Sequence, residues 1–153
     1  LEGPLLQTPR ISASGVLLDG KVCLVGGFDP VEGAPLRSLA MFDPVSGGWG
    51  VTPPALASAR VAPAVGVLSN ALYVMGGCNE AADDTSRLAS VEVYEPRDAR
   101  WSNGPTLRSV RDGAVAGTLA GRLYICGGFG GSAGGGTSMR LSSVEVLDAA
   151  AGE

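Results

Sequence analysis

The chain has 153 residues, of which 45% are hydrophobic, and it carries a net charge of −4. That apolar content is too high for a disordered chain, and no run of about 18 apolar residues suggests a membrane-spanning helix. Acidic residues outnumber basic ones by 15 to 11, which argues against a nucleic-acid partner. Because no long apolar run is present, we expect no membrane partner either.

Histidine is absent, which removes the commonest metal ligand and the commonest general base at neutral pH. The three cysteines, Cys23, Cys78 and Cys126, form no C-x-x-C pair, so neither a disulfide framework nor a zinc site is expected. We expect Cys23 and Cys126 to be buried free thiols in strands. Free thiols favour a reducing compartment, and we expect the cytoplasm.

One set of landmarks occurs three times, at a spacing of about fifty residues. A glycine pair ends a short apolar run at residues 26–27, 76–77 and 127–128. A Pro-x-Leu-x-x-x-Arg string lies upstream of each pair, and an apolar segment that ends in an acidic residue lies downstream. Such regularity indicates an internal repeat in which each unit is one small structural element.

Each unit predicts short strands and tight turns. In the first unit, two apolar runs meet at Asp19-Gly20, which is typical of a two-residue hairpin turn. The equivalent turns fall at residues 69–70 and 120–121. The third strand of each unit is expected over about 38–43, 89–95 and 142–148, and fourth strands over 48–52 and 100–102. A four-stranded antiparallel sheet with two apolar faces must stack against its neighbours.

These residues resemble the kelch repeat, in which a glycine doublet ends the second strand, a Tyr-Asp-Pro-like sequence ends the third and a tryptophan lies in the fourth. The matching structural residues are Gly26, Gly27, Gly76, Gly77, Gly127, Gly128, Phe42, Tyr94, Trp49 and Trp101. Two departures weaken the match. Leu147-Asp148-Ala149 lacks the aromatic ring and the proline, and Ala40 stands where the other units carry Glu92 and Glu145.

The resemblance implies an all-β fold, a kelch-type β-propeller whose four-stranded antiparallel blades surround a channel. It covers residues 1–153 as one partial propeller with repeats at about 4–53, 54–104 and 105–153. The spacing would place a third tryptophan at position 154, so we expect the third blade to lack its outer strand. Three blades cannot close a ring, so further blades of the same protein or a second copy are expected to complete it.

Arg10, Arg60 and Arg111 precede the first strand of each unit, and radial repetition would place them on one face near the channel. Arginines at this position often line the partner pocket of peptide-binding kelch domains, so the resemblance makes them candidates. The planar guanidinium group suits carboxylates. The alternative is that each arginine pairs with backbone carbonyls or with an acid such as Glu92 or Glu145. The sequence leaves both open.

Loops on a rigid scaffold often carry recognition, and here they join the second and third strands at about 28–35, 78–87 and 129–140. Phe28 and Phe129, directly after the doublets, are candidates for stacking on a ligand. Further candidate partner-binding residues in the loops are Asp83, Asp84 and Arg140. The acidic residues match no calcium-binding spacing, so we predict no metal site and no cofactor.

The sequence contains no nucleophile–base constellation, so it predicts a protein–protein interaction module that binds a peptide or protein, and not an enzyme. The resemblance implies three settings for such a module: the substrate-recognition part of a cullin-3 ubiquitin ligase adaptor, an actin-binding propeller, or an architectural propeller. A galactose-oxidase-type or sialic-acid-processing enzyme would need catalytic residues from outside this chain, because copper ligation requires imidazole.

Overall fold

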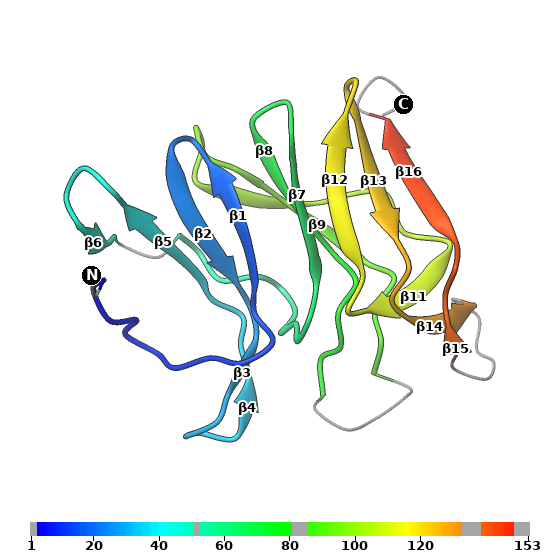
Figure 1. Ribbon diagram of the computed structural model, residues 1–153, viewed down its shortest axis with the longest axis horizontal. Helices are drawn as coiled ribbons and strands as arrows, with labels where there is room; N and C mark the ends of the chain where they lie inside the picture. Colours follow the sequence, from blue (N-terminus) through cyan, green and yellow to red (C-terminus); the bar gives the residue numbers. More distant parts are fainter. Residues whose placement is uncertain (1–2, 51–52, 81–85, 133–138, 149–153) are drawn as a thin grey trace.

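The computed structural model describes residues 3–50, 53–80, 86–132 and 139–148. All regular elements of this part of the chain are β-strands, and the strands form three main sheets that stand side by side (Figure 1). Within these ranges, no helix has the length and apolar character needed to cross a membrane. The all-β class that the repeat predicts is therefore confirmed.

The first two sheets each contain four antiparallel strands, as predicted. The first sheet has the order β1 (Ser14–Leu18), β2 (Lys21–Val25), β5 (Leu39–Asp43) and β6 (Gly48–Trp49). The second has the same order with β7 (Ala64–Leu68), β8 (Ala71–Met75), β9 (Val91–Glu95) and β10 (Arg100–Asn103). The expected hairpin turns join the first two strands of each sheet, and Asp19 and Gly20 adopt the positive φ angles that such turns require.

The third sheet contains three strands within the described residues: β12 (Val115–Leu119), β13 (Arg122–Cys126) and β16 (Val144–Asp148). The first strands of the three sheets, β1, β7 and β12, lie next to one another. This is the arrangement of inner strands around a propeller axis, so the sheets are three blades of a partial propeller.

Two small sheets were not predicted. The strands β3 (Phe28–Asp29) and β4 (Ala34–Pro35) form a hairpin in the first loop. In the third repeat, β11 (Ser109–Asp112), β14 (Phe129–Ser132) and β15 (Met139–Arg140) form a sheet. All of these segments except β11 were expected to be loops. The strands β3, β4 and β15 are only two residues long and β14 contains two glycines, which hides the alternation of a strand.

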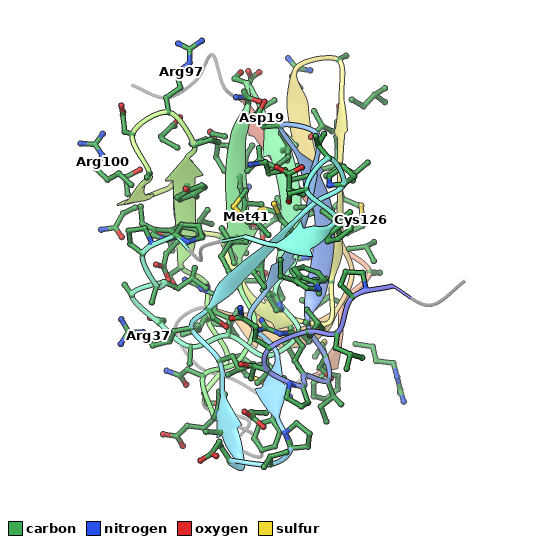
Figure 2. The ribbon with its side chains drawn as sticks, turned by 90° about the vertical axis from the view of Figure 1, so that its left-hand side faces the viewer. Asp19, Arg37, Met41, Arg97, Arg100 and Cys126 are labelled. Atoms are coloured by element: carbon green, nitrogen blue, oxygen red, sulfur yellow. The ribbon has the colours of Figure 1, made fainter. Side chains whose placement is uncertain are left out.

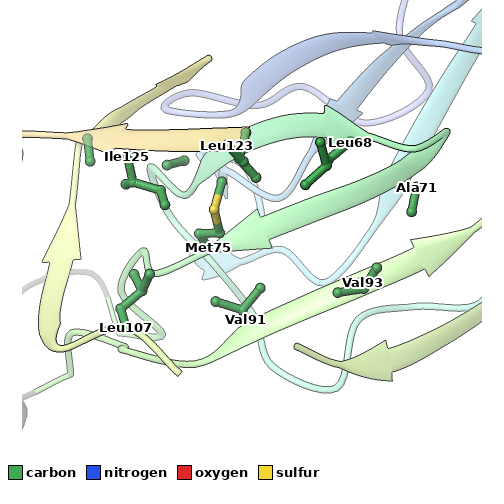
Figure 3. Packing of buried hydrophobic residues seen from close by; sticks show 10 residues of the cluster. Leu68, Ala71, Met75, Val91, Val93, Leu107, Leu123 and Ile125 are labelled. Carbon is green, nitrogen blue, oxygen red and sulfur yellow. The ribbon is translucent and has the colours of Figure 1, made fainter. Parts of the chain in front are cut away.

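The hydrophobic core consists of two clusters, one at each contact between blades. Between the first and second blades, the buried residues include Leu18, Cys23, Leu39, Leu72 and Tyr94. Between the second and third blades, Figure 3 shows side chains of β7, β8 and β9 packed with side chains of β13; the labelled ones are Leu68, Ala71, Met75, Val91, Val93, Leu107, Leu123 and Ile125. The second blade is therefore covered on both faces.

The three cysteines are free thiols, but they differ in burial. Cys23 lies in the first cluster, and burial raises the pKa of its thiol to about 11 against the opposing charge of Lys21. Cys126 is partly exposed, so the prediction of a buried thiol was wrong. Its neighbour Ile125 packs against the second blade, and alternation along the strand turns Cys126 to the opposite face.

The glycine doublets lie where the backbones of adjacent blades meet. The amide of Gly27 donates a hydrogen bond to the carbonyl of Arg60 at 2.8 Å, and Gly77 donates to Arg111 at the same distance. A Cβ atom on Gly26 or on Gly76 would clash with the carbonyl oxygen of the same arginine. The doublet glycines also have positive φ angles, so both space and backbone conformation favour glycine here.

Replacing Gly76 by alanine should therefore be much more costly than replacing a glycine in an open turn. Gly76→Ala introduces a Cβ against the Arg111 carbonyl at φ +63°, and we expect a loss of about 3 kcal/mol or more in the free energy of unfolding. The control is Gly121→Ala, since Gly121 has φ +73° but no atom within 4 Å of its Cβ position; about 1 kcal/mol is expected there. Urea titration measures both, and equal losses would contradict the close approach of the blades.

Candidate partner-binding surface

Arg60 forms a buried polar cluster inside the second blade. Its side chain is 0% exposed, and its Nε and Nη2 atoms donate to one carboxylate oxygen of Glu92 at 3.2 and 3.0 Å. Its Nη1 donates to the carbonyl oxygens of Gly76 at 2.6 Å and Ser90 at 3.0 Å. Burial lowers the pKa of Arg60, and the hydrogen bonds and charge of Glu92 oppose this effect. The cluster ties the segment before β7 to β8 and β9.

Arg111 forms the equivalent cluster in the third blade. Its Nη2 donates to Glu145 at 2.7 Å and to the hydroxyl of Ser143 at 3.1 Å, and its Nη1 donates to the carbonyl of Gly127 at 2.9 Å. Its Nε has no hydrogen-bond partner among the described residues. Because two blades share this arrangement, the arginine and the glutamate belong to the framework of the repeat.

Arg10 occupies the same position in the first blade, but the residue opposite it is Ala40 instead of a glutamate. Its Nη1 donates to the carbonyl of Gly26 at 3.0 Å, and it forms no ion pair with any described residue. Burial lowers its pKa, and the charge of Asp29 opposes this effect.

Of the two alternatives that the sequence left open for the arginines, the structure favours the framework role for Arg60 and Arg111. Both side chains are fully buried and bonded within their own blades, so neither offers a surface to a partner. The expectation of channel-facing arginines came from their radial repetition and from the resemblance to peptide-binding kelch domains. The alternative of pairing with Glu92 and Glu145 is the one that the buried ion pairs support.

The residues that follow the doublets line one end of the blades. Phe28 pairs with Ile11, Cys78 with Val61, and Phe129 with Asp112. Figure 1 places β3, β4, β14 and β15 at the same end of the sheets, with the β3–β4 hairpin below the first blade and the β14–β15 pair below the third. We call this surface the loop face and define it by Ile11, Phe28, Cys78, Arg87, Asp112, Phe129, Met139 and Arg140.

Arg87 links the second and third blades at the loop face. Its Nε donates to Asp112 at 2.6 Å, and its guanidinium carbon lies 4.4 Å from the centre of the Phe129 ring. Burial raises the pKa of the Cys78 thiol, and the charge of Asp112 adds to this effect. Sequence reasoning missed Arg87 and Asp112 as a pair, because Asp112 has no acidic counterpart in the other units, where Ile11 and Val61 stand. The only hint was an arginine in an acidic loop.

The loop face brings together several predicted partner-binding residues. Phe129 is 37% exposed and pairs across the β14–β15 ladder with Arg140, which is exposed. Phe28 is partly buried in the β3–β4 hairpin. Asp83 and Asp84 lie outside the described residues. Within the part of the chain that the structure covers, no group of three His, Cys, Asp or Glu side chains could hold a metal ion.

Radial stacking of repeated antiparallel sheets is typical of a propeller that is built from sequence repeats. A family model described as the kelch motif matches residues 59–108 and 111–152. The chain therefore belongs to the kelch-repeat family. The matched spans differ by a few residues from the repeat bounds expected from the sequence, which stay a prediction.

Similar proteins carry kelch repeats together with different domains. The chain is 29% identical over 133 residues to human Kelch repeat and BTB domain-containing protein 12, covering 76% of this chain and 21% of that protein. It is 37% identical over 127 residues to mouse Kelch-like protein 26, covering 80% and 20%. An F-box/kelch-repeat protein of Arabidopsis thaliana is 33% identical over 101 residues, covering 66% and 21%. The chain thus spans about a fifth of the length of these relatives.

The framework role of the arginine and glutamate predicts a large loss of stability when the charge of the acid is removed. Glu92→Gln leaves the buried Arg60 without its counter-ion, and we expect a loss of about 3 kcal/mol or more. The control is Arg122→Gln, which breaks the exposed pair with Asp148 and should cost less than about 1 kcal/mol. Denaturant unfolding compares the two variants, and a small effect of Glu92→Gln would show that the pair does not support the blade.

Proposed function

We propose that this chain is a protein-interaction module of a longer kelch-repeat protein and that it binds a peptide or protein partner through the loop face. The observation that carries the proposal is the exposure of apolar side chains at that face, beside the β3–β4 hairpin and on the small sheet of the third repeat. Ile11 is 56% exposed, Phe129 37% and Met139 57%. Exposed apolar groups rimmed by polar ones are typical of protein-binding surfaces.

The chemistry of the loop face suits a polypeptide partner. Aromatic residues, methionine and arginine are enriched at the buried centres of protein interfaces, and Phe129, Met139 and Arg140 lie together on β14 and β15. Pairing of these short strands holds the side chains in place before binding, which reduces the entropy lost on association. A partner could thus contact an apolar centre with a cationic group beside it.

Several narrower assignments are also proposals. The names of the relatives combine kelch repeats with a BTB domain in one case and an F-box in another, and we propose that the chain recognises the substrate of a ubiquitin ligase adaptor, for which a cullin-3 ligase is one candidate. We propose a non-enzymatic role and a cytoplasmic location. Three free cysteines support a reducing compartment.

Peptide display against the whole chain tests the loop face. Peptides selected on the wild-type chain should lose at least about tenfold in affinity for Phe129→Ala and for Arg140→Gln, since truncating an interface anchor costs more than about 1 kcal/mol. The matched control is Arg100→Gln, since Figure 2 shows Arg97 and Arg100 on the side of the molecule away from the β3–β4 hairpin. Affinity is measured by calorimetry.

Unchanged affinity for both loop-face variants, together with a loss of affinity for Arg100→Gln, would show that the peptides bind elsewhere and not at the loop face. Failure to select any peptide would count against peptide binding by this module. The thermal midpoint of each variant is measured in parallel, so that a folding defect is not mistaken for lost binding.

A further inference from the structure

Two dipeptides of the chain place an aspartate directly before a glycine, Asp19-Gly20 and Asp112-Gly113. In such a pair, the backbone nitrogen of the glycine can attack the side-chain carboxyl carbon of the aspartate, because glycine has no Cβ atom to obstruct the approach. The attack closes a succinimide ring only if the peptide unit between the two residues can rotate. The two pairs have the same chemistry, but the structure holds their peptide units very differently.

The turn at Asp19-Gly20 leaves its peptide unit unrestrained. Both residues are exposed and have positive φ angles, of 49° and 72°. Among the described residues, none accepts a hydrogen bond from the N–H of Gly20, none donates one to the carbonyl of Asp19, and none forms an ion pair with the Asp19 carboxylate. A Cβ atom at Gly20 would meet no atom within 4 Å. The peptide unit can therefore rotate without breaking a contact.

The pair Asp112-Gly113 is held on both sides of the bond that would have to rotate. The N–H of Gly113 donates a hydrogen bond to the carbonyl of Ala62 at 2.9 Å, which joins the second and third blades. The carboxylate of Asp112 accepts a hydrogen bond from Arg87 at 2.6 Å. Ring closure here would break both contacts, so the folded structure should suppress it.

The turn that carries Asp19 stays exposed in a blade that has a neighbour on each side. The second blade is covered on both faces, yet Ser69 and Asn70 of its equivalent turn are exposed. Figure 2 shows Asp19 at the end of the molecule opposite the β3–β4 hairpin. The turn thus projects from the end of a sheet and not from a face on which another blade packs. The exposure of Asp19-Gly20 therefore does not depend on which blades adjoin the first one.

We propose that Asp19-Gly20 is a site of covalent self-modification, at which the aspartate converts to isoaspartate. The Gly20 nitrogen forms a bond with Cγ of Asp19, the Cγ–OH bond breaks, and the hydroxyl leaves with the amide proton as water. Water then adds to one of the two ring carbonyls. Addition at Cγ restores aspartate, whereas addition at the main-chain carbonyl carbon breaks the original peptide bond and leaves Gly20 attached through Cγ. Water is released and consumed, so no other reactant is needed.

Isoaspartate at this turn would weaken the contact between the first and second blades. It adds the Cβ methylene to the backbone, which lengthens a two-residue turn that now closes the pair of Leu18 with Lys21. Leu18 is 1% exposed and packs in the cluster between these blades. The turn lies at the opposite end of the sheets from the loop face, so the test of this site does not depend on the proposed function.

The test is the uptake of oxygen from water by the folded whole chain, since each ring opening adds one oxygen atom. The chain is incubated in heavy-oxygen water at neutral pH, digested with trypsin in ordinary water and analysed by mass spectrometry. Cleavage after arginine and lysine places the two pairs on separate peptides, residues 11–21 and 112–122. We expect the Asp19 peptide to take up label at least about tenfold faster than the Asp112 peptide. In urea, where no structure restrains either pair, the two rates should be similar.

The third repeat supplies a matched control for the stability effect, because its turn is Ala120-Gly121. Asp19→Ala gives the first repeat the same turn sequence and removes the reacting carboxyl group. Prolonged incubation should lower the thermal midpoint of the wild-type chain by about 2 °C or more as isoaspartate accumulates. The midpoint of the Asp19→Ala chain should stay unchanged over the same time.

Two labelling results would overturn the assignment of the site. The first is equal uptake by the Asp19 and Asp112 peptides of the folded chain. The second is an Asp19 peptide that stays unlabelled in the folded chain over a time that labels it in urea. A wild-type chain that accumulates isoaspartate and keeps its midpoint would contradict the link to the contact between blades. The labelling uses the wild-type chain alone, so it decides the assignment even if the variant does not fold.

Discussion

Each sheet of this chain has apolar side chains on both faces, and a single sheet cannot remove both faces from water. The clusters between adjacent blades solve this problem: Leu72 and Val74 of the second blade pack towards the first, while Met75 and Val91 pack towards the third. Such packing requires the backbones to approach closely where the blades meet. The glycine doublets permit that approach, which explains why they recur with the period of the sheets.

The buried polar residues of the repeats and the polar residues at the loop face have different functions. The buried pairs of Arg60 with Glu92 and Arg111 with Glu145 connect the segment before each blade to the middle of that blade. These pairs consist of an arginine and a glutamate that recur at equivalent positions in the second and third repeats. Residues that do not recur, such as Asp112 and Met139, are found at the loop face. Regular residues therefore build the scaffold, and variable ones remain for recognition.

The blades, their strand order and the hairpin turns could be predicted because the repeat places apolar runs and turn residues at fixed intervals. The burial of Arg60 and Arg111 could not be decided, since a recurring arginine suits either a partner or a glutamate inside the blade. The contact of Arg87 with Asp112 and Phe129 joins residues from two repeats and occurs once among the residues that the structure describes. Periodicity carries no information about such a contact. The lack of an ion pair at Arg10 was visible in the sequence, because Ala40 stands where the other repeats carry Glu92 and Glu145.

Residue-resolved hydrogen exchange under native conditions tests most directly whether contact between blades stabilises the chain. The second blade is covered on both faces, whereas Val144 and Val146 of β16 remain exposed on the outer face of the third. We predict that the amides of β8 exchange most slowly and that those of β16 exchange at least about tenfold faster. Equal protection of β8 and β16, or slower exchange in β16, would contradict the account.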